Sequence, residues 1–199
     1  MINAKVRRLW DQAMSPVGRR VAATPIEPNW ITVVGVLFQI YAFVEILKGH
    51  LMIASLATLV AGTADVLDGA VAKARGLTSR FGAFLDSTTD RLSDALFFVP
   101  IAWLYAVTPD KPGRGQHWVA ALALTALVAA FLVSYIKARA EALGYDCNVG
   151  LAERAERWIL MVLGLFFDVL PLAVAILAVV SSITVVQRFL HVRKQASSE

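Results

Sequence analysis

Residues 65–90 read DVLDGAVAKARGLTSRFGAFLDSTTD, and the rest of the chain is organised around them. The stretch holds four carboxylates, Asp65, Asp68, Asp86 and Asp90, between two long apolar runs. A charge in the hydrocarbon region of a membrane costs at least about 2.5 kcal/mol. A chain keeps four such charges only where something offsets that cost, and a divalent metal ion is the simplest partner.

The apolar runs predict the fold class. The chain has 199 residues, of which 58% are hydrophobic, more than a soluble domain of this size needs. Runs of about 20 apolar residues are long enough to cross a membrane as helices. We therefore predict an all-α polytopic membrane protein that forms a single domain over residues 1–199. Six transmembrane helices are expected within residues 30–190, at about 30–47, 51–72, 84–107, 117–138, 155–170 and 171–190. Because the fifth run is short, the fifth and sixth could instead form one broken hairpin.

Basic residues are distributed unevenly over this predicted topology. With both termini in the cytoplasm, 15 lysines and arginines fall on the inner side and three, Lys48, Lys111 and Arg114, on the outer side. Since cytoplasmic segments are enriched in Lys and Arg, we predict a protein of the cell membrane whose carboxylates face the cytoplasm. The basic clusters suit anionic membrane lipids, and no nucleic-acid partner is expected. The clusters at the two termini could equally serve only to set the topology.

The N-terminal region precedes the first predicted span. Residues 1–24 carry apolar side chains near one helical face and basic side chains off it, which predicts an amphipathic helix in the inner membrane interface. An ordinary amphipathic helix packed on the protein fits the pattern equally well. TPIEPNWIT follows at 24–32, and its prolines disfavour helix upstream. Asn29 is therefore the expected N-cap of the first membrane helix, with the hydroxyl of Thr32 near the same end.

Spacing decides what the four aspartates can do. Asp65 and Asp68 are three residues apart and Asp86 and Asp90 are four apart, so each pair shares a helical face. A turn at 76–79 makes the two helices antiparallel, and helical rise places both pairs about 7–13 Å from the cytoplasmic edge. An all-oxygen cage suits Mg²⁺ or Mn²⁺ rather than Zn²⁺. Two such ions can hold a diphosphate.

Residues beside the aspartates fit a phosphate ligand. Gly69 directly follows Asp68, where a side chain would obstruct a ligand lying on the helix. Lys73 can bind phosphate oxygens, and Ser79 can donate a hydrogen bond from the connecting turn. Gly82 opens the facing helix, where close helix packing is the simpler explanation.

The spaced pattern resembles the signature of the CDP-alcohol phosphotransferases, DxxDGxxA(R)x₈GxxxDxxxD, with every gap preserved. One position departs from it, because Lys73 stands where the family usually has Arg. Lys keeps the charge but loses the bidentate fork, so its contact with the diphosphate is less secure. The resemblance implies a homodimeric enzyme that releases CMP from a CDP-linked lipid. It also implies that Asp90 is the general base.

Three further segments, SYIKARAE at 134–141, ERAER at 153–157 and VQR at 186–188, resemble the actinobacterial phosphatidylinositol-phosphate synthase subgroup, as does TPIEPNWIT. This narrower resemblance implies transfer from CDP-diacylglycerol to inositol 1-phosphate. The residues expected to bind CDP-diacylglycerol are Asn29, Trp30, Ile31, Thr32, Gly69, Lys73 and Ser79. Those expected to bind inositol phosphate are Ser134, Lys137, Arg139, Arg154, Arg157 and Arg188. A dianionic acceptor needs such cations, although Arg139 and Arg157 could instead pair with Glu141 and Glu153.

The implied cofactor is Mg²⁺, with two ions expected and Mn²⁺ possible. All four aspartates are candidate metal ligands. Asp65, Asp68 and Asp86 are expected to hold one ion, and Asp86 and Asp90, with help from Asp68 or Asp65, the second. Asp94 continues the face of Asp90 by one turn and could pair with Arg91.

Two alternatives remain open at this point. Phosphatidylglycerophosphate synthases also use a phosphorylated acceptor, glycerol 3-phosphate, and the stretch at 134–141 argues against them. A divalent-cation transporter also carries intramembrane carboxylates. A transporter needs them near mid-membrane, whereas these cluster in the inner third.

Overall fold

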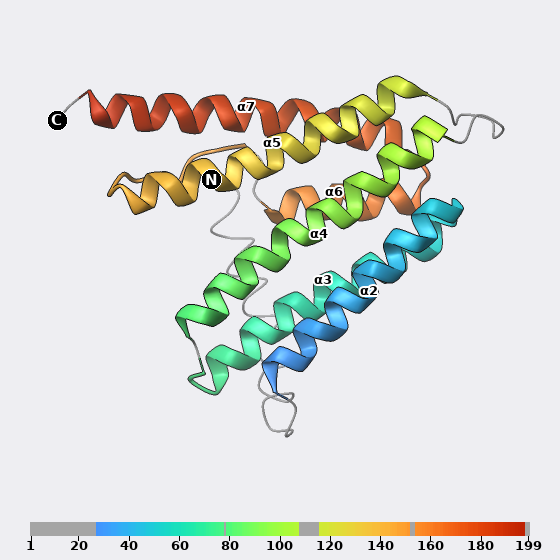
Figure 1. Cartoon of the computed structure of the whole chain (residues 1–199), viewed down its shortest axis with the longest axis horizontal. Helices are drawn as coiled ribbons and strands as arrows, with labels where there is room; N and C mark the ends of the chain where they lie inside the picture. Colours follow the sequence, from blue (N-terminus) through green and yellow to red (C-terminus); the bar gives the residue numbers. More distant parts are fainter. Residues whose placement is uncertain (1–26, 78, 108–115, 152–153, 198–199) are drawn as a thin grey trace.

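The computed structural model describes residues 27–77, 79–107, 116–151 and 154–197. These residues form an all-helical protein, as the sequence predicted (Figure 1). The helices are α2 (Pro28–Lys48), α3 (Leu51–Ala74), α4 (Arg80–Val107), α5 (His117–Ala142), α6 (Arg154–Phe166) and α7 (Leu170–Ala196). Within the described residues, α2, α3, α5 and α7 are long and apolar enough to cross a membrane. Together with the composition, they indicate a membrane protein.

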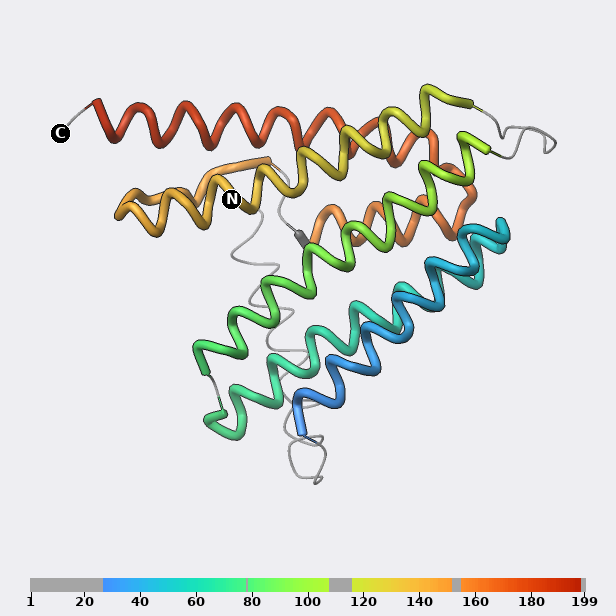
Figure 2. The backbone as a smooth tube through the Cα atoms, viewed as in Figure 1, coloured from blue at the N-terminus to red at the C-terminus, as the bar shows by residue number. Residues whose placement is uncertain are grey.

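The helices pack in a ring, in the order α2, α3, α6, α7, α5, α4 and back to α2. Figure 2 shows α2 and α3 side by side and α5 beside α7, with α4 between the two pairs. The centre of the ring is filled by fully buried side chains, among them Phe97, Phe98 and Ile101 of α4, Leu165 of α6 and Leu170 of α7. Although a short turn joins α3 to α4, within the described residues their backbones do not pack against each other.

The first membrane helix begins before the expected cap. Its first residue is Pro28 and its N-cap is Glu27, so the prediction that Asn29 caps the helix is wrong. The fixed φ of proline suits the first helical position, where its missing N–H is no loss. The helix therefore starts at the proline, and Asn29 lies exposed in the first turn.

The last two predicted spans form two helices, α6 and α7, which are joined by residues 167–169 and contact each other. Asp168 adopts a positive φ of 53° in this connection, a conformation that Asp tolerates better than most residues. α6 has 13 residues, whereas α7 has 27 and continues past the expected end at 190. The predicted interfacial helix at 1–24 lies outside the described residues.

Candidate active site

The aspartates lie near the C-terminal end of α3 and the N-terminal end of α4, the two helices that the sequence predicted to carry them. α3 presents Asp65 and α4 presents Asp86 and Asp90, and one oxygen from each of the three carboxylates lies within 4.8 Å of the others. Oxygen ligands on opposite sides of a hard divalent cation are roughly 4–5 Å apart. The three carboxylates therefore fit a divalent metal ion by both distance and donor type.

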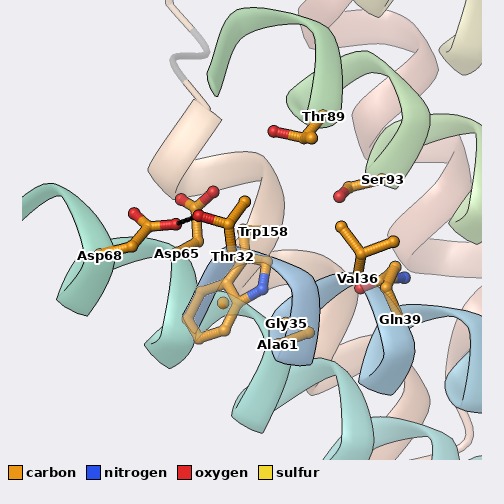
Figure 3. A pocket seen from close by; sticks show the side chains of 11 residues that line it. Thr32, Gly35, Val36, Gln39, Ala61, Asp65, Asp68, Thr89, Ser93 and Trp158 are labelled. Carbon is orange, nitrogen blue, oxygen red and sulfur yellow. Dashed lines mark hydrogen bonds between the residues drawn. The ribbon is translucent and has the colours of Figure 1, made fainter. Parts of the chain in front are cut away.

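Asp68 lies beside Asp65 at the same cavity but is not one of the three mutually close carboxylates. It is 9% exposed, and the hydroxyl of Thr32 on α2 donates a hydrogen bond to its Oδ2 atom (Figure 3). The structure thus places the fourth carboxylate against the start of α2. That Asp68 binds metal stays a prediction.

A cavity of about 40 Å³ lies beneath these carboxylates. A buried water needs roughly 10–15 Å³ of this space, so the cavity has room for about three waters. Its lining residues come from four helices, and Figure 3 shows their side chains around the cavity. Its lining residues are Thr32, Gly35, Val36 and Gln39 of α2, Ala61, Gly62, Asp65 and Asp68 of α3, Thr89 and Ser93 of α4, and Trp158 of α6.

Four of these lining residues, Gln39, Thr89, Ser93 and Trp158, escaped the sequence analysis. Thr89 and Ser93 had a local signal, because each lies three residues after a motif aspartate on the same predicted helix. Gln39 also carried a signal, a polar side chain inside a predicted apolar span, and it is 4% exposed. No local spacing links Gln39 or Trp158 to the aspartates.

Most of the residues expected to bind the nucleotide are exposed, and Ile31 and Thr32 are half-buried. Trp30 is 64% exposed, and Lys73 is also exposed. A Cβ atom added to Gly69 would meet no other atom within 4 Å, so the surface over that turn of α3 is open. Ser79 immediately precedes α4, and its hydroxyl oxygen accepts a hydrogen bond from the Gly82 amide at 2.9 Å.

Two of the expected acceptor-binding cations lie together at the α5–α6 connection. Lys137 donates a hydrogen bond to Asn148 at 3.0 Å and lies 3.8 Å from Glu141. Arg188 is buried, and its guanidinium donates to the carbonyl oxygens of Val149 at 2.9 Å and Val133 at 2.5 Å. Both cations border the buried Cys147, whose pKa is raised by burial. Two positively charged side chains, accompanied by Glu141, are therefore held at this end of the bundle.

The other acceptor candidates are more scattered. Ser134 is half-buried on α5 and Arg139 is exposed. Arg154 is the first residue of α6, and its side chain is outside the described part of the chain.

Arg157 lies elsewhere, between α6 and α4. Its Nη2 atom is 3.3 Å from Oδ2 of Asp94, and the two side chains are 5% and 9% exposed. Asp94 thus pairs with Arg157 rather than with the expected Arg91, which lies 3.4 Å from Asp90. The pair joins helices that are 63 residues apart in the sequence.

The sequence of this chain matches the family model of the CDP-alcohol phosphatidyltransferases over residues 26–188. It is 34% identical to an archaetidylinositol phosphate synthase of Pyrococcus horikoshii, covering 96% of this chain and 97% of that protein. It is 37% identical to a phosphatidylinositol phosphate synthase of Corynebacterium glutamicum, covering 98% and 90% of the two chains.

Solved structures show the same likeness. The phosphatidylinositol phosphate synthase of Mycobacterium tuberculosis, solved with CDP-DAG bound, superposes with a TM-score of 0.80 at 32% identity over 91% of this chain and 94% of that one. The same enzyme in complex with manganese and citrate also superposes with a TM-score of 0.80 at 32% identity. This match covers 90% of this chain and 88% of that one. The family model and these relatives each cover most of the chain, and three of the four motif aspartates, Asp65, Asp86 and Asp90, come together in the structure. This chain therefore belongs to the CDP-alcohol phosphatidyltransferase family.

Proposed function

We propose that this chain transfers the phosphatidyl group of CDP-diacylglycerol to inositol 1-phosphate, giving phosphatidylinositol phosphate and CMP in phospholipid biosynthesis. The observation that carries the proposal is the approach of Asp65, Asp86 and Asp90 to within 4.8 Å, with a separate cationic site at Lys137 and Arg188. The names of the relatives support an inositol phosphate acceptor, and the CDP-DAG complex of the mycobacterial relative supports the lipid donor.

The carboxylates are proposed to hold two Mg²⁺ ions, with Mn²⁺ as a substitute. The ligands would be Asp65, Asp68, Asp86 and Asp90, and the manganese complex of the mycobacterial relative supports a divalent ion. When bound, such ions would neutralise the diphosphate and stabilise charge on the leaving group.

Asp90 is proposed to act as the general base. It takes the proton from an inositol hydroxyl, and the resulting oxygen attacks the phosphorus that bears the diacylglycerol. The new oxygen–phosphorus bond forms as the bond to the bridging oxygen breaks, and CMP leaves with that oxygen.

The substrates are proposed to approach from two sides of the carboxylates. Asn29, Trp30, Ile31, Thr32, Gly69, Lys73 and Ser79 would contact CDP-diacylglycerol. Ser134, Lys137, Arg139, Arg154 and Arg188 would contact inositol phosphate, whose dianionic phosphate needs cations. Arg157 is left out of this set because its guanidinium lies against Asp94.

We further propose that residues 1–199 form one domain with six transmembrane helices and an interfacial helix at 1–24. The excess of basic residues on one side supports a cell-membrane location with the site facing the cytoplasm. α4 would cross the membrane despite its carboxylates because Asp94 is buried and paired within the protein. A homodimer is proposed on the family resemblance.

A second candidate differs in the donor lipid. The Pyrococcus relative is named for an archaetidyl product, so a CDP-linked archaetidyl lipid is an alternative donor for the same acceptor.

In the test, purified protein and Mg²⁺ are incubated with one of the two donors, CDP-diacylglycerol or the CDP-linked archaetidyl lipid. Each donor is combined in turn with one of four acceptors: inositol 1-phosphate, glycerol 3-phosphate, free inositol or serine. CMP release with inositol 1-phosphate is the expected result, and the better donor identifies the lipid. Release with glycerol 3-phosphate but not with inositol 1-phosphate would refute the proposed acceptor.

A further inference from the structure

The spacing of the metal-binding carboxylates depends on more than the hairpin that carries them. Asp65 lies on α3 and its two partners lie on α4, yet within the described residues these two helices do not pack against each other. Their separation is therefore set by the helices that contact both. α2 is one, since it packs against α3 and α4, and α6 provides the other connection.

Two consecutive residues of α6 reach the two carboxylate-bearing helices. Arg157 extends to α4 and meets Asp94 at 3.3 Å. Asp94 is four residues after Asp90, so the ion pair lies one helical turn below that carboxylate on the same face. Both side chains are more than nine-tenths buried. A buried, paired charge holds its partner helix in place because separating the pair would leave an uncompensated charge in the interior.

Trp158 makes the matching contact with α3. Its indole ring lies against Gly62, where an added Cβ would come within 2.3–2.5 Å of three ring atoms. Gly62 is three residues before Asp65, one turn away on the same face. Trp158, Gly62 and Asp65 all line the same cavity, in which Figure 3 labels Trp158 and Asp65. The ring therefore fixes how closely α6 approaches the turn of α3 that carries Asp65.

We propose that these two contacts, Arg157 with Asp94 and Trp158 with Gly62, form a brace that sets the distance from Asp65 to Asp86 and Asp90. Arg157 is then a positioning residue for the metal ligands and does not bind the acceptor phosphate. The brace rests on one part of the proposed function, which is that these aspartates bind a divalent metal ion.

The guanidinium of Arg157 supports this role over acceptor binding. Its Nη2 atom is engaged by Asp94, and among the described residues its buried Nε atom has no hydrogen-bond partner. An acceptor ligand needs donors at an accessible surface, whereas this side chain is 5% exposed. Lys137, by comparison, is 39% exposed.

The test measures Mn²⁺ binding to the full-length protein in detergent by the loss of the free-ion electron paramagnetic resonance signal. No substrate is present, so the readout is independent of catalysis. Arg157→Gln, Asp94→Asn and Gly62→Ala are compared with wild type. Arg193→Gln, which removes an exposed cation near the end of α7, is the matched control. Groups that orient metal ligands typically contribute roughly 10- to 100-fold to metal affinity.

The brace predicts that all three variants weaken Mn²⁺ binding about 10-fold or more, that Arg157→Lys recovers part of the loss, and that the control binds as wild type does. In Arg157→Gln, the KM for inositol 1-phosphate at saturating metal should stay within about twofold of wild type.

Two results would overturn the brace. One is unchanged Mn²⁺ binding in Arg157→Gln, with or without a raised acceptor KM. The other is unfolding of Arg157→Lys and Gly62→Ala alike, which would assign the contacts to folding. If wild-type protein binds Mn²⁺ but transfers no lipid to inositol phosphate, the proposed function fails while the brace is still decided by the binding data.

Discussion

The hydroxyl of Thr32 donates a hydrogen bond to the carboxylate of Asp68, which lies 36 residues further along the chain (Figure 3). Thr32 is in the second turn of α2, and Asp68 is six residues before the end of α3. The bond therefore fixes the orientation of one motif carboxylate from a helix outside the motif. Both residues line the cavity with Asp65, so this contact forms part of the site.

Replacing Thr32 with Val removes the donor and keeps the shape of the side chain. A hydrogen bond to a charged group is worth about 1.5–3 kcal/mol, which corresponds to roughly 10- to 100-fold in an equilibrium constant. We expect kcat/KM for the CDP-linked lipid to fall by about that factor. Thr125→Val is the matched control, since that hydroxyl bonds only to the carbonyl of Ala121 on its own helix. Equal activities of the two variants would contradict the assigned role.

Local spacing explains why much of this protein was predictable from its sequence. The apolar runs gave the helices, and the i,i+3 and i,i+4 spacings correctly placed Asp65 opposite Asp86 and Asp90. Such periodicities depend on backbone geometry alone. The first helix start was missed because Pro28 and Asn29 compete for that end, and the proline at the first helical position prevailed.

Contacts between distant helices were not predictable in the same way. Asp94 and Arg157 are 63 residues apart, and each had a plausible partner nearby in the sequence, Arg91 and Glu153. Which residue a charged side chain pairs with depends on which helices become neighbours when the helices pack into a ring. The same holds for Gln39 and Trp158, whose place at the cavity follows from packing.

Gly69→Ala separates ligand binding from folding. A Cβ at this position meets no atom of the protein within 4 Å, and Ala favours a helix over Gly by about 1 kcal/mol. We expect an unchanged or raised Tm together with a raised KM for the CDP-linked lipid, because the methyl group would occupy space left for the diphosphate. A Tm that falls in Gly69→Ala would show that the glycine serves helix packing.

Gly164→Ala is the comparison for Gly69→Ala, because its Tm should fall instead of rising or staying unchanged. A Cβ at Gly164 would lie 2.6 Å from the Cβ of Ala173, where α6 approaches α7. Overpacking of this kind costs about 1–3 kcal/mol, so the Tm in detergent should fall. A Tm equal to that of wild type would mean that the two helices can separate at no cost.

Arg154→Gln tests the proposed acceptor site at the start of α6. Loss of a cation that contacts the acceptor phosphate should raise the KM for inositol 1-phosphate more than the KM for the CDP-linked lipid. Steady-state kinetics with each substrate varied in turn measures both values. The reverse order of effects would argue against acceptor binding at this position.

The thiol of Cys147 should react slowly in the folded protein. The thiol is buried, and burial raises its pKa, so the reactive thiolate is scarcer at neutral pH than for a free cysteine. We expect slow alkylation by a maleimide at pH 7 and fast alkylation after unfolding. Because the chain has a single cysteine, mass spectrometry of the intact protein reports this site alone. Alkylation of the folded protein at the rate of the unfolded chain would contradict the buried position.

The most direct test of the proposed reaction is the identity of the lipid that the purified protein makes from CDP-diacylglycerol, inositol 1-phosphate and Mg²⁺, determined by mass spectrometry. Wild type should yield phosphatidylinositol phosphate together with CMP. Chelation of the metal should abolish both products, and Asp90→Asn should slow their formation by at least about 100-fold, as for loss of a general base. A wild-type protein that forms no phosphatidylinositol phosphate, or an Asp90→Asn variant that forms it at the wild-type rate, would contradict this account.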